Sequence, residues 1–192
     1  MIRDFGRLFT CLLVVALTIS MLPAANAEQT NGIPISSVEE LIALDGQRDS
    51  YYLTTDLDLS GTNWTPIEFF GMLDGQGHTI SGLSITATTE NQNRYGLFST
   101  IMSISDLEYE RVAVKNLNLT DVHIDLTLPG GCEYWVGGLC GYAYQATIEN
   151  IHSTGSVQVR SINNEDSHDV SVAGICGEAS NWYVRFFDCV NE

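Results

Sequence analysis

Basic residues are scarce in this sequence, which has 8 Lys and Arg against 24 Asp and Glu and a net charge of −16. Lys115 is its only lysine. A surface this acidic repels phosphate groups and anionic lipid headgroups, so we expect binding neither to nucleic acid nor to a membrane surface. Beyond residue 22 no apolar run is long enough to cross a bilayer, so we expect no membrane insertion of the mature chain.

Sequence signatures of catalysis are also missing. There is no Gly-x-Ser-x-Gly, no His-x-x-x-His, no phosphate-binding loop and no dinucleotide-binding motif. The cysteines lack the Cys-x-x-Cys spacing of zinc sites. Four scattered histidines are expected at turns or on polar strand faces: His78, His123, His152 and His168. We therefore expect no catalytic residue, no cofactor and no dedicated metal site.

Residues 1–27 have the pattern of a cleavable signal peptide. Arg3 and Arg7 give a basic start, residues 8–22 are almost all apolar, and residues 25–27 read Ala-Asn-Ala. A buried or anchoring helix is the alternative, but the short apolar core and the small-x-small exit favour cleavage after Ala27. We therefore expect a secreted or cell-surface protein whose mature part is residues 28–192.

One helix is expected, over residues 36–46, where Ser37 and Glu40 match a capping box and Gly46 suits the helix end. Its apolar stripe would be Val38, Leu41, Ile42 and Leu44. Residues 47–192 consist of short alternating segments broken by Gly, Asn and Asp, which indicates strands. The clearest strands are expected over residues 51–59, 79–86, 117–128, 147–162 and 170–176.

Two short phrases recur along these strands. The first is Gly-Leu-Phe at 96–98, Gly-Leu-Cys at 138–140 and Gly-Ile-Cys at 174–176. The second contains the bend residues Asn116, Asn150 and Asp188, and a degenerate earlier copy places Gly82 before Asn116 at the same spacing as Asn116 before Asn150. Strand-rich units of this length predict stacked rungs with a shared core. A parallel β-solenoid fits better than a β-propeller, whose blades need four strands and closure.

Residues 52–60, 64–67 and 70–83 resemble the opening of proteins that carry the GLUG repeat, and the Gly-Gly-Leu-Cys-Gly and Ala-Gly-Ile-Cys-Gly blocks resemble the repeat itself. The similarity covers about residues 36–192. Such repeats occur in bacterial secreted and cell-surface proteins, including immunoglobulin-cleaving metalloproteases, where they form a non-catalytic β-helical stalk. The resemblance therefore implies an all-β fold, a right-handed parallel β-helix with a short N-terminal capping helix. Here cysteine stands where the repeat more often has a small aliphatic residue.

Shared repeat positions predict what the side chains do. An apolar ladder inside the solenoid is expected from Leu83, Leu117, Ile151 and Cys189, with the preceding polar residues at left-handed bends. Cys140 and Cys176 also share a position, and strand spacing puts stacked Cα atoms within disulfide range. Free cysteine suits an apolar ladder equally well, and we favour buried thiols over a rung-to-rung disulfide.

Asp56, Asp58 and Ser60 copy the first half of a calcium-binding EF-hand loop. The twelfth position of that loop is Ile67, however, and the intervening leucines alternate with the acids as they would in a strand. We therefore interpret the segment as a strand with its acids outside, which leaves only weak calcium binding at an acidic surface as a hypothesis.

These patterns favour a non-enzymatic secreted or cell-surface module that serves as a stalk, or as an adhesive face for a glycan or a protein. Aromatic residues around the glycine phrases could form a stacking surface, although packing on the solenoid flank explains them too: Trp135, Tyr142, Tyr144, Trp182 and Tyr183. The alternative is a polysaccharide-degrading β-helix enzyme or the accessory part of a larger secreted protease. A glycosidase needs two carboxylates facing one groove, and the repeats contain no adjacent Asp pair.

The last repeat phrase, at residues 186–189, is followed only by Val190, Asn191 and Glu192. In the earlier copies the same phrase runs into a long strand. An open last rung exposes unpaired backbone and the end of an apolar core. We therefore expect that this chain is a fragment of a longer repeat protein, incomplete at its C-terminus, or that a partner covers its last rung. Isolated residues 28–192 should self-associate or aggregate through the open edge.

Overall fold

The computed structural model describes residues 32–86, 92–102, 112–128, 133–161, 169–180 and 183–192, all within a unit of residues 31–192. The proposed signal peptide, Cys132, His168 and Trp182 lie outside these residues. The regular secondary structure of the described part is almost entirely β-strand, with one short helix, so the predicted all-β class is confirmed. No helix among the described residues is long and apolar enough to cross a bilayer.

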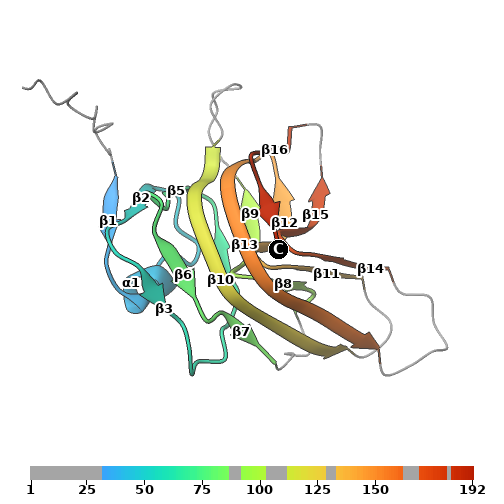
Figure 1. Cartoon of the computed structure of the whole chain (residues 1–192). Coiled ribbons are helices and arrows are strands. Elements are labelled where there is room, and N and C mark those ends of the chain that lie inside the picture. The colour runs from blue at the N-terminus through green and yellow to red at the C-terminus, as the bar shows by residue number, and fades with distance from the viewer. Residues whose placement is uncertain (1–31, 87–91, 103–111, 129–132, 162–168, 181–182) are drawn as a thin grey trace, which may run out of the picture. The chain divides into compact units, whose positions relative to one another are not determined.

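Three sheets make up the fold (Figure 1). The large sheet has ten strands: β1 (Ile33–Ile35), β2 (Ser50–Leu53), β3 (Leu57–Asp58), β5 (Met72–Asp74), β6 (Thr79–Ser81), β7 (Ser84–Ile85), β10 (Val112–Leu128), β13 (Thr147–Ser161), β16 (Arg185–Phe187) and β17 (Val190–Asn191). The four-stranded sheet contains β4 (Ile67–Phe69), β9 (Phe98–Met102), β12 (Cys140–Tyr144) and β15 (Cys176–Ser180). The three-stranded sheet contains β8 (Arg94–Tyr95), β11 (Tyr134–Gly137) and β14 (Val170–Ala173).

The strands pair in parallel, and the chain visits the sheets in a fixed order. It runs from the three-stranded sheet to the four-stranded sheet and then to the large sheet, as in β8–β9–β10 and again in β11–β12–β13. We call each such pass a rung. The two longest strands, β10 and β13, lie side by side in Figure 1. Leu117 pairs with Ile151, and His152 pairs with Val190, so the later copies of the second phrase recur at the spacing of stacked strands, as predicted.

The earliest predicted repeat copy is wrong. Asn116 does not stand over Gly82 but over the Gln76–Gly77 turn, because the N–H of Gly77 donates to the Asn116 carbonyl at 2.8 Å. Strand β10 bends twice, at Asn116 and at Asp121, with φ of 54° and 55°. Gly82 belongs with the second bend, since its N–H donates to the Thr120 carbonyl. Leu83 is therefore buried, as expected, but is not in register with Leu117.

The predicted left-handed bends are confirmed and carry a hydrogen-bonded ladder. Asn116, Asn150 and Asp188 have φ of 54°, 51° and 48°. The side chain of Asn150 donates to that of Asn116 at 2.9 Å, and Asn116 donates in turn to the Asp74 carboxylate at 3.0 Å. Lys115 pairs with the other oxygen of Asp74 at 3.2 Å. The bend residues therefore join successive rungs as well as turning the chain.

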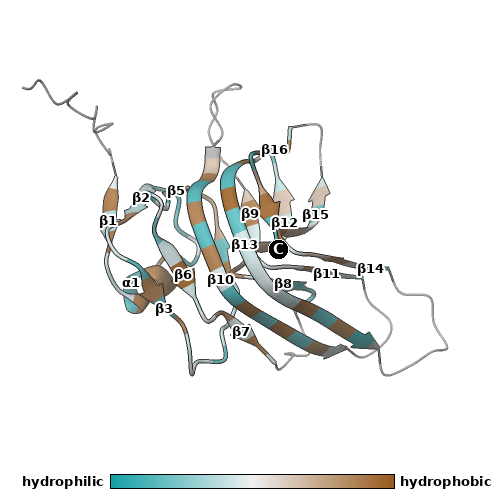
Figure 2. Cartoon of the chain, viewed as in Figure 1, coloured by the Kyte–Doolittle hydropathy of each residue, from teal (hydrophilic) through white to brown (hydrophobic). Residues whose placement is uncertain are grey.

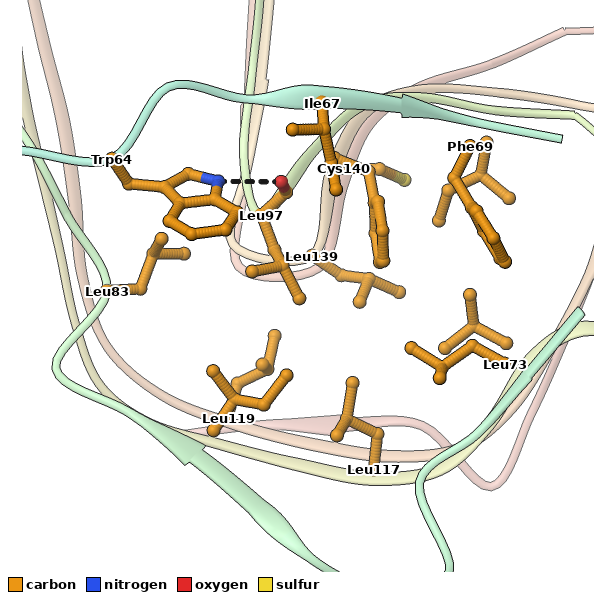
Figure 3. Packing of buried hydrophobic residues seen from close by; sticks show 14 of the residues in the cluster. Trp64, Ile67, Phe69, Leu73, Leu83, Leu97, Leu117, Leu119, Leu139 and Cys140 are labelled. Atoms are coloured by element: carbon orange, nitrogen blue, oxygen red, sulfur yellow. Dashed lines mark hydrogen bonds between the residues drawn. The ribbon is translucent and has the colours of Figure 1, made fainter. Parts of the chain in front are cut away.

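Alternation of apolar and polar residues along β10 and β13 directs one face of each strand inward (Figure 2). The inward side chains pack with those of the other sheets into one continuous core, in which Leu73, Leu117 and Leu139 are at most 1% exposed (Figure 3). The indole N–H of Trp64 donates to the Leu97 carbonyl at 2.8 Å, so the one polar atom of this buried ring is satisfied.

The predicted helix is present but shorter, as α1 (Val38–Ile42). Ser37 is its N-cap and accepts from the Glu40 N–H at 3.2 Å. Glu40 reaches back chiefly to Ser36, whose N–H and then whose hydroxyl lower the pKa of this carboxyl. Leu41 is buried as expected, whereas Ile42 is 49% exposed because the helix ends there and presents only one side to the core.

The predicted strands over 51–59, 79–86 and 170–176 are each broken by a bend into two elements. The prediction for residues 117–128 starts too late, because β10 already begins at Val112. The short strands β4, β5, β8, β9, β11 and β12 were not expected. They are two to five residues long, and a glycine separates β4 from β5, β8 from β9 and β11 from β12, so alternation has too few positions to appear.

Candidate functional site

The three-stranded and four-stranded sheets meet at a cluster of one arginine and two aromatic rings. Trp135 on β11 is the register partner of Arg94 on β8. The Arg94 Cζ atom lies 5.2 Å from the centroid of the Trp135 ring and 4.4 Å from that of Tyr142 on β12. The two ring centroids are 5.5 Å apart. We call Arg94, Trp135 and Tyr142 the arginine–aromatic cluster.

Hydrogen bonds fix the position of Arg94. Its Nη1 donates to the hydroxyl of Thr100, a residue only 5% exposed, at 2.9 Å. Its carbonyl accepts from the side-chain amide of Gln92 at 2.8 Å. The Nε of Arg94 is buried and has no hydrogen-bond partner in the part of the chain that the structure describes. A guanidinium with a buried, unpaired N–H is unusual, because leaving such a donor unsatisfied is costly.

A glycine of the repeat phrase brings β12 up to this arginine. A Cβ atom at Gly141 would lie 2.8 Å from the Cα of Arg94 and 2.7 Å from the backbone nitrogen of Tyr95. Only glycine therefore fits at this position, and its neighbour Tyr142 is held against the guanidinium. Burial also raises the pKa of Tyr95 to about 12, and the Tyr95 hydroxyl donates to the Gln92 carbonyl at 2.8 Å.

The cluster offers a guanidinium and two ring faces for non-covalent contacts. Arginine presents a planar set of donors that matches a carboxylate or sulfate group, and aromatic rings stack on apolar faces of sugars. Arg94 covers one face of each ring, and this contact itself contributes about 0.5–2 kcal/mol. The cluster therefore also joins the β8–β9 rung to the β11–β12 rung.

The structure brings together two of the five aromatic residues that were predicted to stack. Trp135 and Tyr142 belong to the cluster. Tyr144 follows Tyr142 along β12 on the same face, because side chains of a strand alternate. Tyr183 is 48% exposed and precedes β16, away from the cluster's own strands. Trp182 is outside the described residues.

Sequence reasoning missed Arg94. Alignment of Gly96-Leu97 with Gly138-Leu139 places Asn93, not Arg94, beneath Trp135. The observed register is shifted by one residue, since Trp135 pairs with Arg94 while Cys140 pairs with Phe98. The later copies contain one more residue at this corner, Gly137 in the middle copy and Ala173 in the last. The scarcity of basic residues was the signal that could have drawn attention to Arg94.

The calcium candidates have separate hydrogen-bond partners. Asp56 accepts from the Thr79 N–H at 2.9 Å and lies 3.1 Å from the ring of His78, and these two contacts lower its pKa. Asp58 accepts from the Ser60 N–H at 2.8 Å, which lowers its pKa. Among the described residues, no group of three or more His, Cys, Asp and Glu side chains could hold a metal ion.

The structure places Cys140 and Cys176 side by side as register partners on β12 and β15. Both are free thiols, as is Cys189. Burial raises the pKa of the Cys140 thiol well above its usual value, and the neighbouring Cys176 adds to this effect. We expect these thiols to stay free after export, which is checked by counting free thiols in the denatured, unreduced protein.

Comparison with known proteins connects this architecture to a repeat family. Residues 136–158, which span the end of β11, all of β12 and most of β13, match the family model described as the GLUG motif. The chain is also 31% identical over 153 residues to Halomucin of Haloquadratum walsbyi. That alignment covers 66% of this chain, which spans about 2% of the length of Halomucin. No solved structure matches the chain.

Both similarities fit a repeat protein of the cell surface or the extracellular space. The motif coincides with the best-paired rungs of the structure, where β12 and β13 each have parallel neighbours on both sides. The predicted resemblance is therefore confirmed, and this chain carries the repeat of the GLUG family at residues 136–158.

Proposed function

We propose that this chain is a non-enzymatic module of a secreted or cell-surface protein, and that its sheets wind as a right-handed parallel β-helix that acts as a stalk. The observation that carries the proposal is the residue-by-residue register of β10 on β13 at the repeat spacing. Each rung adds about 4.8 Å along the stack, so the length of such a stalk grows with the number of repeats.

Rigidity follows from the continuity of the core and of the polar ladder. Val136, Leu139 and Ile148, all from one rung, are fully buried between the rungs before and after them. Asn150 and Asn116 connect the same rungs on the outside. In a stack of this kind, each rung contacts only its neighbours. The stack itself resists bending, so the stalk function requires no dedicated binding site.

The stalk proposal predicts that the chain accepts one more rung. Residues 116–149, inserted a second time after Glu149, should give a protein that unfolds cooperatively with a larger urea m-value, because more surface is buried. The matched control is a Gly-Ser insertion of equal length at the same point, which should abolish cooperative unfolding of the rungs that follow it. Loss of folding with the duplicated repeat would overturn the stalk proposal.

Export and absence of catalysis are tested on the same preparation. The full chain is expressed with its own residues 1–27, and the exported product is analysed by mass spectrometry. We expect a product that begins at Glu28 and leaves pectin, alginate and chondroitin intact in zymograms. Degradation of any of the three would favour the polysaccharide-degrading enzyme instead. An inactive product is also the result expected of an accessory part of a larger secreted protease.

A second candidate function is adhesion to an acidic glycan through the arginine–aromatic cluster. The guanidinium of Arg94 lies against both rings, and its Nε has no hydrogen-bond partner among the described residues, which favours this function. On an array of uronate-containing and neutral glycans, we expect Trp135→Ala and Arg94→Gln to reduce binding at least tenfold. Tyr183→Ala, which removes an exposed ring outside the cluster, is the control and should bind normally. Absence of binding to every glycan would leave the stalk function alone.

A further inference from the structure

Carboxylates flank the arginine–aromatic cluster along the four-stranded sheet. Glu68 on β4 is the register partner of Thr100, whose hydroxyl accepts from Arg94. On the other side of the cluster, Glu178 on β15 is the register partner of Tyr142. Register partners on neighbouring strands direct their side chains to the same face of the sheet. The two glutamates therefore lie at the ends of one outward column, with Thr100 and Tyr142 between them.

Arg94 itself has no carboxylate partner in the part of the chain that the structure describes. Other cations do have one, since Lys115 pairs with Asp74 and Arg160 pairs with Asp125. The Nη1 of Arg94 already donates to a hydroxyl, and its Nε is buried. For its Nη2 the described residues supply no acceptor. This nitrogen is therefore the donor that an anion from outside the chain can engage.

Uncharged side chains occupy the other positions beside the cluster. Trp135 is followed in register by Ser171 on β14, and Tyr144 on β12 lies between Met102 and Ser180. All five side chains are partly exposed. Tryptophan and tyrosine combine an apolar ring with a polar edge, which suits contact with uncharged sugar units.

We propose that the ligand of the cluster is a glycan with a single acidic group among neutral sugars, and not a polyanion with an acid on every unit. This inference rests on the adhesion function proposed above. One carboxylate or sulfate lies against the guanidinium of Arg94, and neutral units lie over the rings. Acidic groups placed one rung to either side would meet Glu68 or Glu178, and contact between like charges is unfavourable. The net charge of −16 adds repulsion for every further anionic group.

The proposal is tested on a glycan array with the exported full chain. Backbones of glucose, galactose and mannose each carry no acid, one uronate, one sulfate, or an acid on every unit. On at least one backbone, we expect a single-acid form to bind at least tenfold more tightly than both the neutral and the fully acidic form. Comparison of uronate with sulfate identifies the acidic group. Arg94→Gln should reduce binding of the single-acid form to the level of the neutral form.

Removal of the flanking carboxylates tests the cause of this selectivity. Glu68→Gln and Glu178→Gln should each raise binding of the fully acidic glycans about threefold, and leave single-acid binding unchanged. Glu39→Gln is the matched control, because it removes the same charge from an exposed position on α1. High salt should narrow the difference between single-acid and fully acidic glycans, since salt screens the repulsion. Far-UV circular dichroism confirms that each variant is folded.

Failure of this inference and failure of adhesion give different results. Fully acidic glycans that bind as tightly as single-acid ones, with binding still lost in Arg94→Gln, would overturn the single-acid inference and leave adhesion in place. Equal effects of Glu39→Gln and Glu68→Gln would also overturn it, because the flanking carboxylates would then have no specific effect. Absence of binding to every glycan would overturn adhesion and this inference together.

Discussion

Single asparagine residues determine how successive rungs meet at the bend. Asn116 and Asn150 adopt a left-handed backbone and hydrogen-bond to each other at 2.9 Å, so each residue turns the chain and also joins two rungs. Asparagine suits both tasks, because it tolerates positive φ better than other non-glycine residues and carries one donor and one acceptor group. The sequence predicted the bend but not the ladder between the side chains.

Two substitutions of Asn150 separate the contribution of its left-handed backbone from that of its hydrogen bond. Asn150→Ala should lower the free energy of unfolding by about 1–2 kcal/mol for the left-handed backbone and by about 1 kcal/mol more for the lost hydrogen bond. Asn150→Gly should lose only the hydrogen-bond contribution, since glycine adopts positive φ freely. Urea unfolding measures both. Equal losses for the two variants would mean that the left-handed backbone adds nothing to the cost.

Asp56 should contribute to the pH dependence of stability. Its pKa is lowered in the folded protein by the Thr79 N–H and then by His78, so its contribution is present above the unfolded value of about 3.9 and is lost as the pH falls through the lower folded value. Asp56→Asn should therefore reduce stability near neutral pH and flatten its decline in acid, as measured by urea midpoints at several pH values.

The control for this change is Glu133→Gln, which removes one carboxylate from an exposed position on the described surface. This control accounts for the effect of removing one negative charge from a chain whose net charge is −16, where acidic groups repel one another. The explanation fails if both variants show the same pH profile, because the hydrogen bonds of Asp56 would then have no specific effect.

Long strands could be predicted from the sequence, and short strands could not. Strands β10 and β13 are long and alternate regularly, so their existence and their spacing were predictable. The short strands were not, because β8 has only two residues and is defined by its partner Trp135–Val136 rather than by its own pattern. Arg94 lies in the cluster because the register of β8 on β11 is shifted by one residue, and nothing local in the sequence indicates such a shift.

Gly141 tests how closely the three-stranded and four-stranded sheets must approach. Gly141→Ala should lower the free energy of unfolding by about 1–3 kcal/mol, because its new methyl group meets backbone atoms of Arg94 and Tyr95 that cannot move independently. Gly46→Asn is the control, since Gly46 has φ of 71° and no atom lies within 4 Å of the position that a Cβ would take there. Comparable costs at both sites, measured by urea unfolding, would argue against close approach as the cause.

Each rung of the unit is stabilised by the rungs that pack on either side of it. Val136→Ala should cost about 2 kcal/mol, because this side chain lies between two rungs. Val172→Ala, the same substitution at the same repeat position, should cost less than about 1 kcal/mol in the dilute monomer, since the residue is already 45% exposed. Thermal and urea unfolding of the pair measure this gradient along the stack.

Amide hydrogen exchange of the dilute exported chain tests the stacking of repeats most directly. Strands β10 and β13 each have parallel neighbours on both sides, so their amides should be the slowest to exchange. In the part of the chain that the structure describes, strands β14, β15 and β16 have a neighbour on one side only, and their amides should exchange much faster. Exchange of β10 and β13 as fast as that of the last rung would contradict a fold built from repeats stacked in register.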